Sequence, residues 1–335
     1  MKFIAYTANS DEHQYFKETA DEMGIEYVLV GDTLNEETVE LAAGCDGVSD
    51  SMLSKKYDEK VYARLHELGV KYFTVRSVGY DTLDFGLAKK YDLRMANVPA
   101  YSPNAIAEHA LMLALNLVRK NKIVQQRMVT QDFRRENAVG SEIGKMTVGI
   151  IGTGNIGFET AKIFHGFGAR VIGHDHFPRK DTGGFYEEVK TEDDIFAQAD
   201  LISIHVPLFP ETTHFINEAN IAKMKDGVII INTARGPIIK NSDLLKGLLS
   251  GKVGGAGLDV FEFDSHGREI YGEDFKGKII KNKEYREMSQ LPNVMLTPHV
   301  AYNTDVAVGN MVKISSQNLL DFLTTGECKN EVLPK

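Results

Sequence analysis

The sequence predicts an α/β protein built from two doubly wound parallel-sheet domains. Short runs of β-branched and other apolar residues alternate with helical segments from end to end, which is the pattern of parallel sheets covered by helices. A glycine-rich turn stands near the middle of the 335 residues, so another domain precedes it. A proline-containing stretch ahead of that turn breaks the alternation and indicates where the first domain ends.

The first part of the chain has the pattern of a small sheet of its own. Strands are expected near residues 2–6, 25–30, 47–48, 72–75 and 94–97. Helices are expected between them, for example over 36–43 and 58–68. No phosphate-binding glycine motif occurs there. We therefore expect a flavodoxin-like doubly wound domain without a nucleotide site of its own.

The stretch Asn97-Val98-Pro99-Ala100-Tyr101-Ser102-Pro103-Asn104 separates the two domains. Proline cannot continue a strand but suits the first turn of a helix, and Ser102 before Pro103 is a suitable N-cap. We expect a long helix from Ala105 to about Thr130. Its first half is broadly apolar, which predicts burial either between the domains or at a subunit interface.

The second domain should contain strands near residues 148–151, 170–174, 201–205, 227–232, 256–259 and 294–297. A crossover between successive strands gives a full Rossmann unit. A last helix over about 305–325 then returns to the first domain. We therefore expect a discontinuous domain of residues 1–102 plus 299–335, a nucleotide-binding domain of residues 103–298, and a hinge at the two crossings.

The turn after the first of these strands has the composition of a dinucleotide site. In Gly152-x-Gly154-x-x-Gly157 the glycines would allow, in order, a tight turn, close approach of a pyrophosphate and packing of helix on strand. The pyrophosphate would meet N–H groups at the positive end of the helix. Asp175 ends the next strand, where a carboxylate accepts from ribose hydroxyls and repels a 2′-phosphate. The pattern favours NAD, and the nearby Arg179 and Lys180 leave NADP use open as an alternative.

Composition narrows the class of protein. A net charge of −9 argues against nucleic acid or an anionic membrane as the main partner. Cys45 and Cys328 fit neither a disulfide framework nor a metal site, which indicates a reducing compartment, and no metal is expected. The N-terminus has no signal-peptide pattern, and no apolar run approaches the roughly 20 residues that cross a bilayer. We expect a cytoplasmic enzyme.

Polar side chains follow several strands of the second domain, at the edge of the sheet where ligands bind. They are Asp175, His205-Val206-Pro207, Thr233-Ala234-Arg235-Gly236, Asp259 and His299. Each alone has an ordinary explanation, since Arg235 could pair with a surface acid, Asp259 could cap a helix and His299 could simply pack. Together they suit hydride transfer to the ketone of a 2-oxo acid, because arginine binds a carboxylate in forked geometry and histidine can donate the proton.

The chain carries several longer motifs in a fixed order. They are Arg76-Ser77-Val78-Gly79-Tyr80-Asp81, Val98-Pro99-Ala100-Tyr101-Ser102-Pro103-Asn104-Ala105-Ile106-Ala107-Glu108-His109, Gly152-Thr153-Gly154-Asn155-Ile156-Gly157, His205-Val206-Pro207, Asn232-Thr233-Ala234-Arg235-Gly236-Pro237, Gly257-Leu258-Asp259-Val260-Phe261-Glu262 and Asn293-Val294-Met295-Leu296-Thr297-Pro298-His299. With them the chain resembles, over essentially its whole length, the D-2-hydroxyacid dehydrogenase family, and within it the D-lactate and D-2-hydroxyisocaproate branch.

The resemblance implies a role for each candidate residue. Arg235 would bind the substrate carboxylate and carbonyl, His299 would be the acid/base, and Asp259 would contact the nicotinamide carboxamide. Backbone N–H groups of Val78 and Gly79 would hold the carboxylate, with Tyr101 beside it. The cofactor would further be bound by Gly152, Gly154, Asn155, Ile156, Gly157, Asp175, His205, Val206, Pro207, Thr233 and Ala234. The resemblance also implies a homodimer.

The chain departs from the family at the acid that supports the histidine. The family has glutamate five positions beyond the strand-end aspartate, and this chain has Asp264 there. Aspartate is one methylene shorter, and Glu262 competes because it lies on the same face of an extended segment. The register favours Asp264. On that hypothesis Asp264→Asn lowers the pH optimum of reduction and Glu262→Gln does not, and the reverse pattern would reassign the role.

The expected reaction is NADH-dependent reduction of a 2-oxo acid to an (R)-2-hydroxy acid, most simply pyruvate to D-lactate. Alternatives are larger substrates, namely phenylpyruvate, 2-oxoisocaproate and 2-oxoglutarate. The loop of residues 49–53 should line the side-chain pocket, where Met52 suits an apolar group and Asp50 would repel a second carboxylate. A non-catalytic NAD-sensing protein is the alternative of another class, against which Arg235 and His299 together argue.

Overall fold

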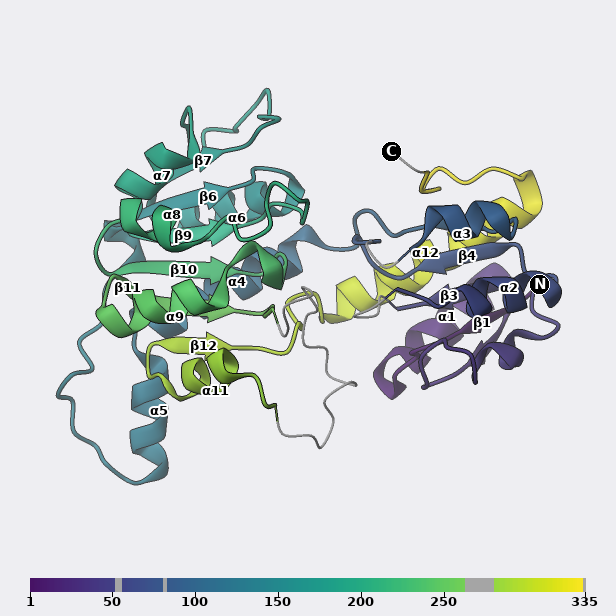
Figure 1. Cartoon of the computed structure of the whole chain (residues 1–335), viewed down its shortest axis with the longest axis horizontal. Helices are drawn as coiled ribbons and strands as arrows, with labels where there is room; N and C mark the ends of the chain where they lie inside the picture. Colours follow the sequence, from purple (N-terminus) through teal and green to yellow (C-terminus); the bar gives the residue numbers. More distant parts are fainter. Residues whose placement is uncertain (52–55, 81–82, 263–279, 334–335) are drawn as a thin grey trace. The chain divides into compact units, whose positions relative to one another are not determined.

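The computed structural model describes residues 1–51, 56–80, 83–262 and 280–333. They belong to two compact units, Met1–Ser102 with Asn303–Lys335, and Pro103–Tyr302 (Figure 1). The chain leaves the second unit after Tyr302, later than the boundary at residue 298 expected from the sequence. The amides of Val300 and Ala301 donate to the carboxylate of Asp259, and these hydrogen bonds keep the segment in the second unit.

The first unit contains a five-stranded parallel sheet in the order β2-β1-β3-β4-β5. Its strands are β1 (Lys2–Ala5), β2 (Glu26–Leu29), β3 (Gly47–Asp50), β4 (Tyr72–Val75) and β5 (Arg94–Ala96). This strand order is that of flavodoxin-like sheets, which confirms the predicted fold class.

Helices cover both faces of this sheet. They are α1 (His13–Met23), α2 (Glu59–Glu67), α3 (Phe85–Lys90) and α12 (Asp305–Thr325). Val312 and Leu319 of α12 lie in buried clusters with Ala5 and Phe3 of β1. A segment from the end of the chain thus completes the core of the first unit. The helix expected over residues 36–43 is only a short 3-10 helix, Val39–Ala42.

The second unit contains a seven-stranded parallel sheet in the order β12-β11-β10-β9-β6-β7-β8. Its strands are β6 (Thr147–Ile151), β7 (Arg170–His174), β8 (Glu187–Glu188), β9 (Leu201–Ile204), β10 (Val228–Asn232), β11 (Val253–Leu258) and β12 (Val294–Leu296). Read from β8 to β11 this is the Rossmann order, with β12 added beside β11. Strand β8 was not expected, because two exposed glutamates carry no apolar signal.

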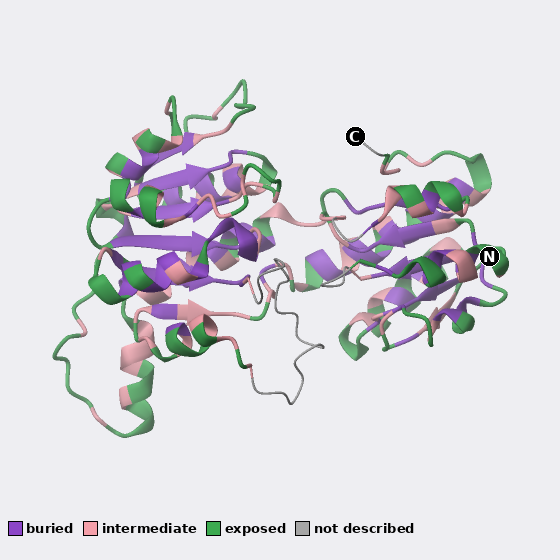
Figure 2. Ribbon diagram, in the orientation of Figure 1, coloured by how far each residue is buried: buried purple, intermediate pink, exposed green. Residues whose placement is uncertain are grey.

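The central strands of both sheets are buried, while the helices that cover them expose their outer faces (Figure 2). In the second unit the helices within the described residues are α4 (Pro103–Val118), α5 (Asn121–Val129), α6 (Asn155–Gly166), α7 (Glu192–Gln198), α8 (Glu218–Lys223), α9 (Asn241–Ser250) and α11 (Lys283–Gln290). Within the described ranges, no helix has the length and apolar character needed to cross a membrane.

The long helix expected from Ala105 to about Thr130 is two helices, α4 and α5. Lys120 lies between them with a left-handed backbone (φ 53°). The amide of Ser141 donates to the carbonyl of Val118 at 2.8 Å and so caps the end of α4. The partner comes from a distant part of the chain, and for that reason local sequence could not reveal the break.

Candidate active site

The glycine-rich turn between β6 and α6 has the geometry of a phosphate cradle. Gly152 has a left-handed backbone (φ 90°), and a Cβ on Gly157 would lie 1.9 Å from the carbonyl oxygen of Gly152, so α6 packs directly on the turn. A Cβ on Gly154 would meet no atom within 4 Å. The backbone of Gly154 therefore borders open space at the start of α6, which fits the pyrophosphate of a dinucleotide.

Asp175 connects the end of β7 to this turn. One carboxylate oxygen accepts from the Thr153 amide at 2.7 Å and the other accepts from the Phe177 amide at 2.8 Å. The carboxylate is half-buried and held in place beside the glycines. Each oxygen retains acceptor capacity, so a ribose hydroxyl could donate to it.

His205 follows β9 and supports the other side of the turn. Its amide donates to the carbonyl of Ile151, and its Nε2 lies 2.8 Å from the hydroxyl of Ser203. Burial lowers the pKa of His205 to about 3. The imidazole is therefore neutral at ordinary pH and unsuited to act as a proton donor.

The loop after β10 holds Arg235 through hydrogen bonds of its backbone. The Asn232 side chain donates to the carbonyl of Arg235 at 2.9 Å and accepts from the amide of Ala234 at 3.0 Å. A Cβ on Gly236 would lie 2.5 Å from the carbonyl carbon of Phe261, so two loops of the sheet edge are in backbone contact. The guanidinium of Arg235 is half-buried, and its Nη1 donates to the carbonyl of Ala234.

His299 lies on a turn that Asp259 holds in place. The Asp259 carboxylate is almost completely buried and accepts from the amides of Val300 and Ala301, both at 2.9 Å, and from the hydroxyl of Thr297. The Asp259 carbonyl accepts from the amide of His299 at 2.8 Å. His299 has a left-handed backbone (φ 54°), a conformation that costs a non-glycine residue free energy and that the Asp259 hydrogen bonds maintain.

His109 extends this network, although no role was assigned to it from the sequence. Its Nε2 lies 3.0 Å from the Thr297 hydroxyl and 3.4 Å from Asp259. Burial lowers the pKa of His109, which favours the neutral ring, while the Asp259 charge opposes the shift. His109 comes from α4, far away in the sequence, so its part in fixing the turn becomes visible only in the folded chain.

Glu262, the competitor for the acid beside His299, has another partner. Its carboxylate oxygens lie 3.0 Å and 3.1 Å from Nε2 of His214, which can donate to them. Its carbonyl accepts from the Asn241 side chain. Asp264, which the register favours, lies outside the described residues.

In the first unit, side chains fix the turn after β4. The carbonyl of Val78 accepts from the Asn97 side chain at 2.8 Å, and the carbonyl of Gly79 accepts from the Ser77 hydroxyl at 2.6 Å. The Val78 carbonyl and the Gly79 amide belong to one planar trans peptide, so the first bond also fixes the direction of that N–H. The carbonyl of Tyr101 accepts from Asn310 of α12.

The structure corrects the expectation for Asp50. This residue is fully buried, and its carboxylate accepts from the Thr7 hydroxyl, the Tyr57 hydroxyl and the Ser51 amide. Burial raises its pKa to about 6. A carboxylate enclosed in this way does not line a pocket, so it cannot repel a second substrate carboxylate by contact. Met52 lies outside the described residues.

Comparisons with known proteins identify the family of the chain. Residues 111–301 match the family described as D-isomer specific 2-hydroxyacid dehydrogenase, NAD binding domain. The chain is 43% identical to a D-2-hydroxyacid dehydrogenase (NAD+) of Lacticaseibacillus paracasei, covering 99% of this chain and 98% of that protein. It is 40% identical to a D-lactate dehydrogenase of Lactiplantibacillus plantarum, covering 99% of each. A solved structure of D-2-hydroxyisocaproate dehydrogenase superposes with a TM-score of 0.90 at 42% identity, covering 99% of both chains.

Proposed function

The chain belongs to the D-isomer specific 2-hydroxyacid dehydrogenase family, and on that premise we propose that it reduces pyruvate to D-lactate. It is an NAD-dependent oxidoreductase. The observation that carries the proposal is the arrangement at one edge of the second sheet. There the Arg235 loop follows β10, the Asp259-held turn with His299 follows β12, and the glycine cradle follows β6.

The residues of the second unit divide the chemistry between them. The nicotinamide, when bound, supplies the hydride. Arg235 binds the substrate carboxylate in a forked geometry and polarises the neighbouring carbonyl. His299 donates a proton to the carbonyl oxygen as it gains charge. Asp259 is a positioning residue, because its buried carboxylate holds the turn on which His299 lies.

We assign the acid beside His299 to Asp264. This assignment is supported by the partner of the competing residue Glu262. The carboxylate of Glu262 already contacts His214 within the described part of the chain, which argues against a role beside His299. The contact of Asp259 with the nicotinamide carboxamide stays a prediction. Three hydrogen bonds already use the buried carboxylate of Asp259, and a contact with the carboxamide would be made in addition to them.

We propose that the first turn of α6 binds the cofactor pyrophosphate. Gly152 and Gly157 shape that turn, and Gly154, Asn155 and Ile156 supply the N–H groups. Asp175 binds the adenosine ribose. The remaining walls are His205, Val206, Pro207, Thr233 and Ala234, which follow β9 and β10.

For the first unit we propose a substrate-binding role. The fixed Gly79 amide and its neighbour at Val78 would hold the substrate carboxylate, with Tyr101 beside it and Met52 against the substrate side chain. Substitution of Tyr101 by phenylalanine and of Met52 by alanine should raise the KM for the 2-oxo acid and leave the NADH affinity unchanged. An altered NADH affinity would reassign these residues.

A panel of 2-oxo acids tests the substrate. NADH oxidation is followed by nicotinamide absorbance with pyruvate, 2-oxoisocaproate, phenylpyruvate and 2-oxoglutarate, and the product is resolved on a chiral column. We expect the highest kcat/KM with pyruvate and an (R)-product. A higher kcat/KM with 2-oxoisocaproate or phenylpyruvate would show that the enzyme prefers a larger 2-oxo acid. NADH binding without oxidation of NADH by any of the four acids would identify an NAD-sensing protein.

We further propose a cytoplasmic homodimer. Cys45 and Cys328 are free, and free cysteines are typical of proteins in a reducing compartment. Val129, Phe133 and Val139, in and after α5, are 85%, 73% and 81% exposed. Large apolar side chains gathered in one exposed segment are typical of a subunit interface.

A further inference from the structure

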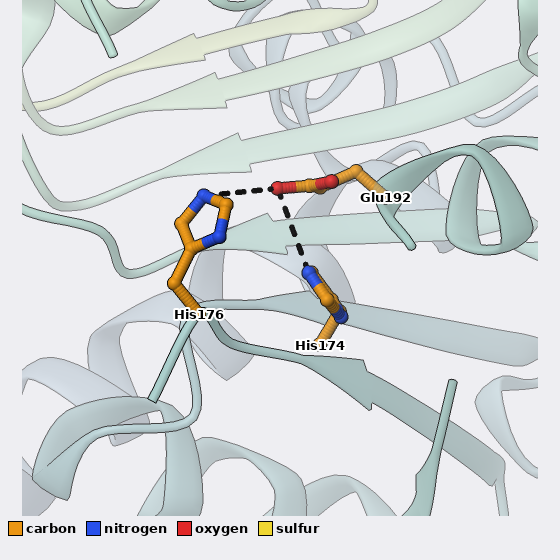
Figure 3. Close-up of side chains that lie close together, drawn as sticks. All are labelled: His174, His176 and Glu192. Atoms are coloured by element: carbon orange, nitrogen blue, oxygen red, sulfur yellow. Dashed lines mark ion pairs between the residues drawn. The ribbon is translucent and has the colours of Figure 1, made fainter. Parts of the chain in front are cut away.

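Three potential metal ligands meet at the carboxyl end of β7, which lies beside the edge strand β8. His174 is the last residue of the strand, His176 follows two positions later, and Glu192 begins α7. Figure 3 shows both imidazole rings directed at the carboxylate between them. Nε2 of His174 lies 3.7 Å from Oε1 of Glu192, and Nε2 of His176 lies 3.6 Å from the same oxygen. The three ligand atoms all lie within 4.8 Å of one another.

The ring of His174 has the orientation of a metal ligand. Its Nδ1 lies 3.0 Å from the carbonyl oxygen of Val189, which can only accept. Nδ1 therefore carries the proton and Nε2 presents its lone pair to the cluster. A carbonyl on the far ring nitrogen is the arrangement that orients metal-binding histidines.

The separations also suit a shared cation better than direct contact. They exceed the 2.7–3.2 Å of an ordinary hydrogen bond. In a tetrahedral zinc site with bonds of about 2.1 Å, neighbouring ligand atoms lie about 3.4 Å apart. Small side-chain rotations would bring His174, His176 and Glu192 to that distance, because the His176 side chain is 78% exposed and can move.

We propose that His174, His176 and Glu192 bind Zn²⁺. Two imidazole nitrogens and one carboxylate oxygen are a ligand set that zinc accepts, with water completing the coordination. Imidazole is a poor ligand for Mg²⁺ and Ca²⁺, which prefer oxygen. The exposure of His176 gives the ion a path from solvent.

The site would act on the cofactor through Asp175, a step that rests on the proposed function. Asp175 stands between His174 and His176 in the sequence. Its carboxylate accepts a hydrogen bond from the amide of Thr153 in the glycine-rich turn. Zn²⁺ would tie the end of β7 to the first turn of α7 and so restrict the backbone that carries Asp175. A preorganised site binds more tightly, and we expect bound Zn²⁺ to increase NADH affinity about threefold.

Calorimetric titration of the chelator-treated protein with Zn²⁺ tests the site. We expect one ion per chain, and at least tenfold weaker binding for His176→Gln and for Glu192→Gln. Both side chains are polar and at least partly solvent-exposed, so these variants should keep the fold. The matched control is His165→Gln, an exposed histidine of α6 in the same unit, which should bind Zn²⁺ as the wild type does. No Zn²⁺ binding, or equal binding by all variants, would overturn the site.

NADH titration with and without Zn²⁺ tests the coupling. An affinity that rises in the wild type but not in Glu192→Gln supports it, and an affinity unchanged by bound Zn²⁺ refutes it. The two proposals fail in different ways. Normal NADH binding without Zn²⁺ binding would refute the proposed metal site alone. Zn²⁺ binding without NADH binding would refute the proposed function and leave the metal-site proposal intact.

Discussion

His299 shows how a single buried carboxylate can fix the turn that carries a candidate acid/base. The left-handed backbone of His299 persists because Asp259 accepts from the two amides that follow it. The backbone position of the histidine is thus set by Asp259, which follows another strand, β11. This relation explains why a fully enclosed aspartate lies at this edge of the sheet.

Replacing Asp259 by asparagine tests this positioning role. The amide nitrogen of asparagine would face the N–H of Val300 or Ala301, which leaves a buried donor without an acceptor. Losing such a charge-assisted bond costs about 1.5–3 kcal/mol, so kcat should fall about 10–100-fold. Steady-state kinetics and NADH titration check the result. A kcat near the wild-type value would contradict the positioning role. A weakened NADH affinity would support the predicted contact of Asp259 with the nicotinamide carboxamide, and an unchanged affinity would argue against that contact.

The lowered pKa of His205 predicts that the free energy of unfolding falls in acid. Its pKa is lowered in the folded chain to about 3, against about 6.5 for a free histidine. The folded state therefore binds fewer protons, so the stabilising contribution is present above about pH 6.5 and is lost as pH falls toward 3. Between pH 6.5 and 5 the loss is up to about 2 kcal/mol.

Urea unfolding of wild type and His205→Gln at pH 7 and pH 5 measures this effect. The variant has no imidazole to protonate, so acid should reduce its stability less than that of the wild type. Equal losses in the two proteins would show that His205 is not the group responsible.

The sequence indicated where the candidate residues lie better than how they are held. The placement of Arg235 and His299 at one edge of the sheet could be predicted, because residues that follow parallel strands converge there. The environments of Asp50 and Glu262 could not, since their partners Thr7 and His214 lie 43 and 48 positions away. Such contacts depend on the packing of loops that carry no periodic pattern.

The turn between β6 and α6 allows us to predict opposite effects of alanine at two of its glycines. A methyl group at Gly157 would lie 1.9 Å from a carbonyl oxygen, whereas one at Gly154 would stand in open space. Gly157→Ala should therefore displace α6 and destabilise the second unit by several kcal/mol, as overpacking does. Gly154→Ala should keep the fold and weaken NADH binding at least tenfold, because the methyl group occupies the approach of the pyrophosphate.

Thermal melting and NADH titration of the two variants separate these effects. The expected pattern is a lowered Tm for Gly157→Ala and a normal Tm with weak NADH binding for Gly154→Ala. Normal NADH affinity in Gly154→Ala would place the pyrophosphate elsewhere.

Strands and helices with strong periodic patterns were predictable to within a few residues. The strand Arg170–His174 and the final helix Asp305–Thr325 were expected with the bounds observed. The break between α4 and α5 was not, because the amide that caps α4 belongs to Ser141. Strand β8 was missed because its position in the sheet depends on pairing with β7 rather than on its own residues.

For the whole molecule, the sequence indicated a chain that crosses twice between units. The mid-chain glycine motif and the last helix made a discontinuous first unit the natural expectation. The side chain of Asn318 in α12 donates to the carbonyl of Asn97 at 2.8 Å, which joins the two segments of that unit. The place of the second crossing depends on Asp259, whose hydrogen bonds no local pattern reveals.

The apolar segment after α5 predicts the oligomeric state. Phe133→Asp places a charge where two large apolar side chains are also exposed, and it should convert a dimer into a monomer. Light scattering at micromolar concentration checks this result. The control is Leu249→Asp, since Leu249 is a 65% exposed apolar residue of the same unit and lies outside this segment. A monomeric wild type would refute the homodimer. Dissociation of the dimer by Leu249→Asp would indicate that the interface includes the surface around Leu249.

We expect Arg235 and His299 together to support hydride transfer from bound NADH to a 2-oxo acid. Rapid mixing of the enzyme–NADH complex with pyruvate measures this step directly in wild type, Arg235→Gln and His299→Gln. We expect NADH oxidation to (R)-lactate in the wild type and a rate about 10²–10⁴-fold lower in His299→Gln, with NADH affinity preserved. Undiminished oxidation in His299→Gln, or a wild type that binds NADH and never oxidises it, would refute the proposed roles of these residues.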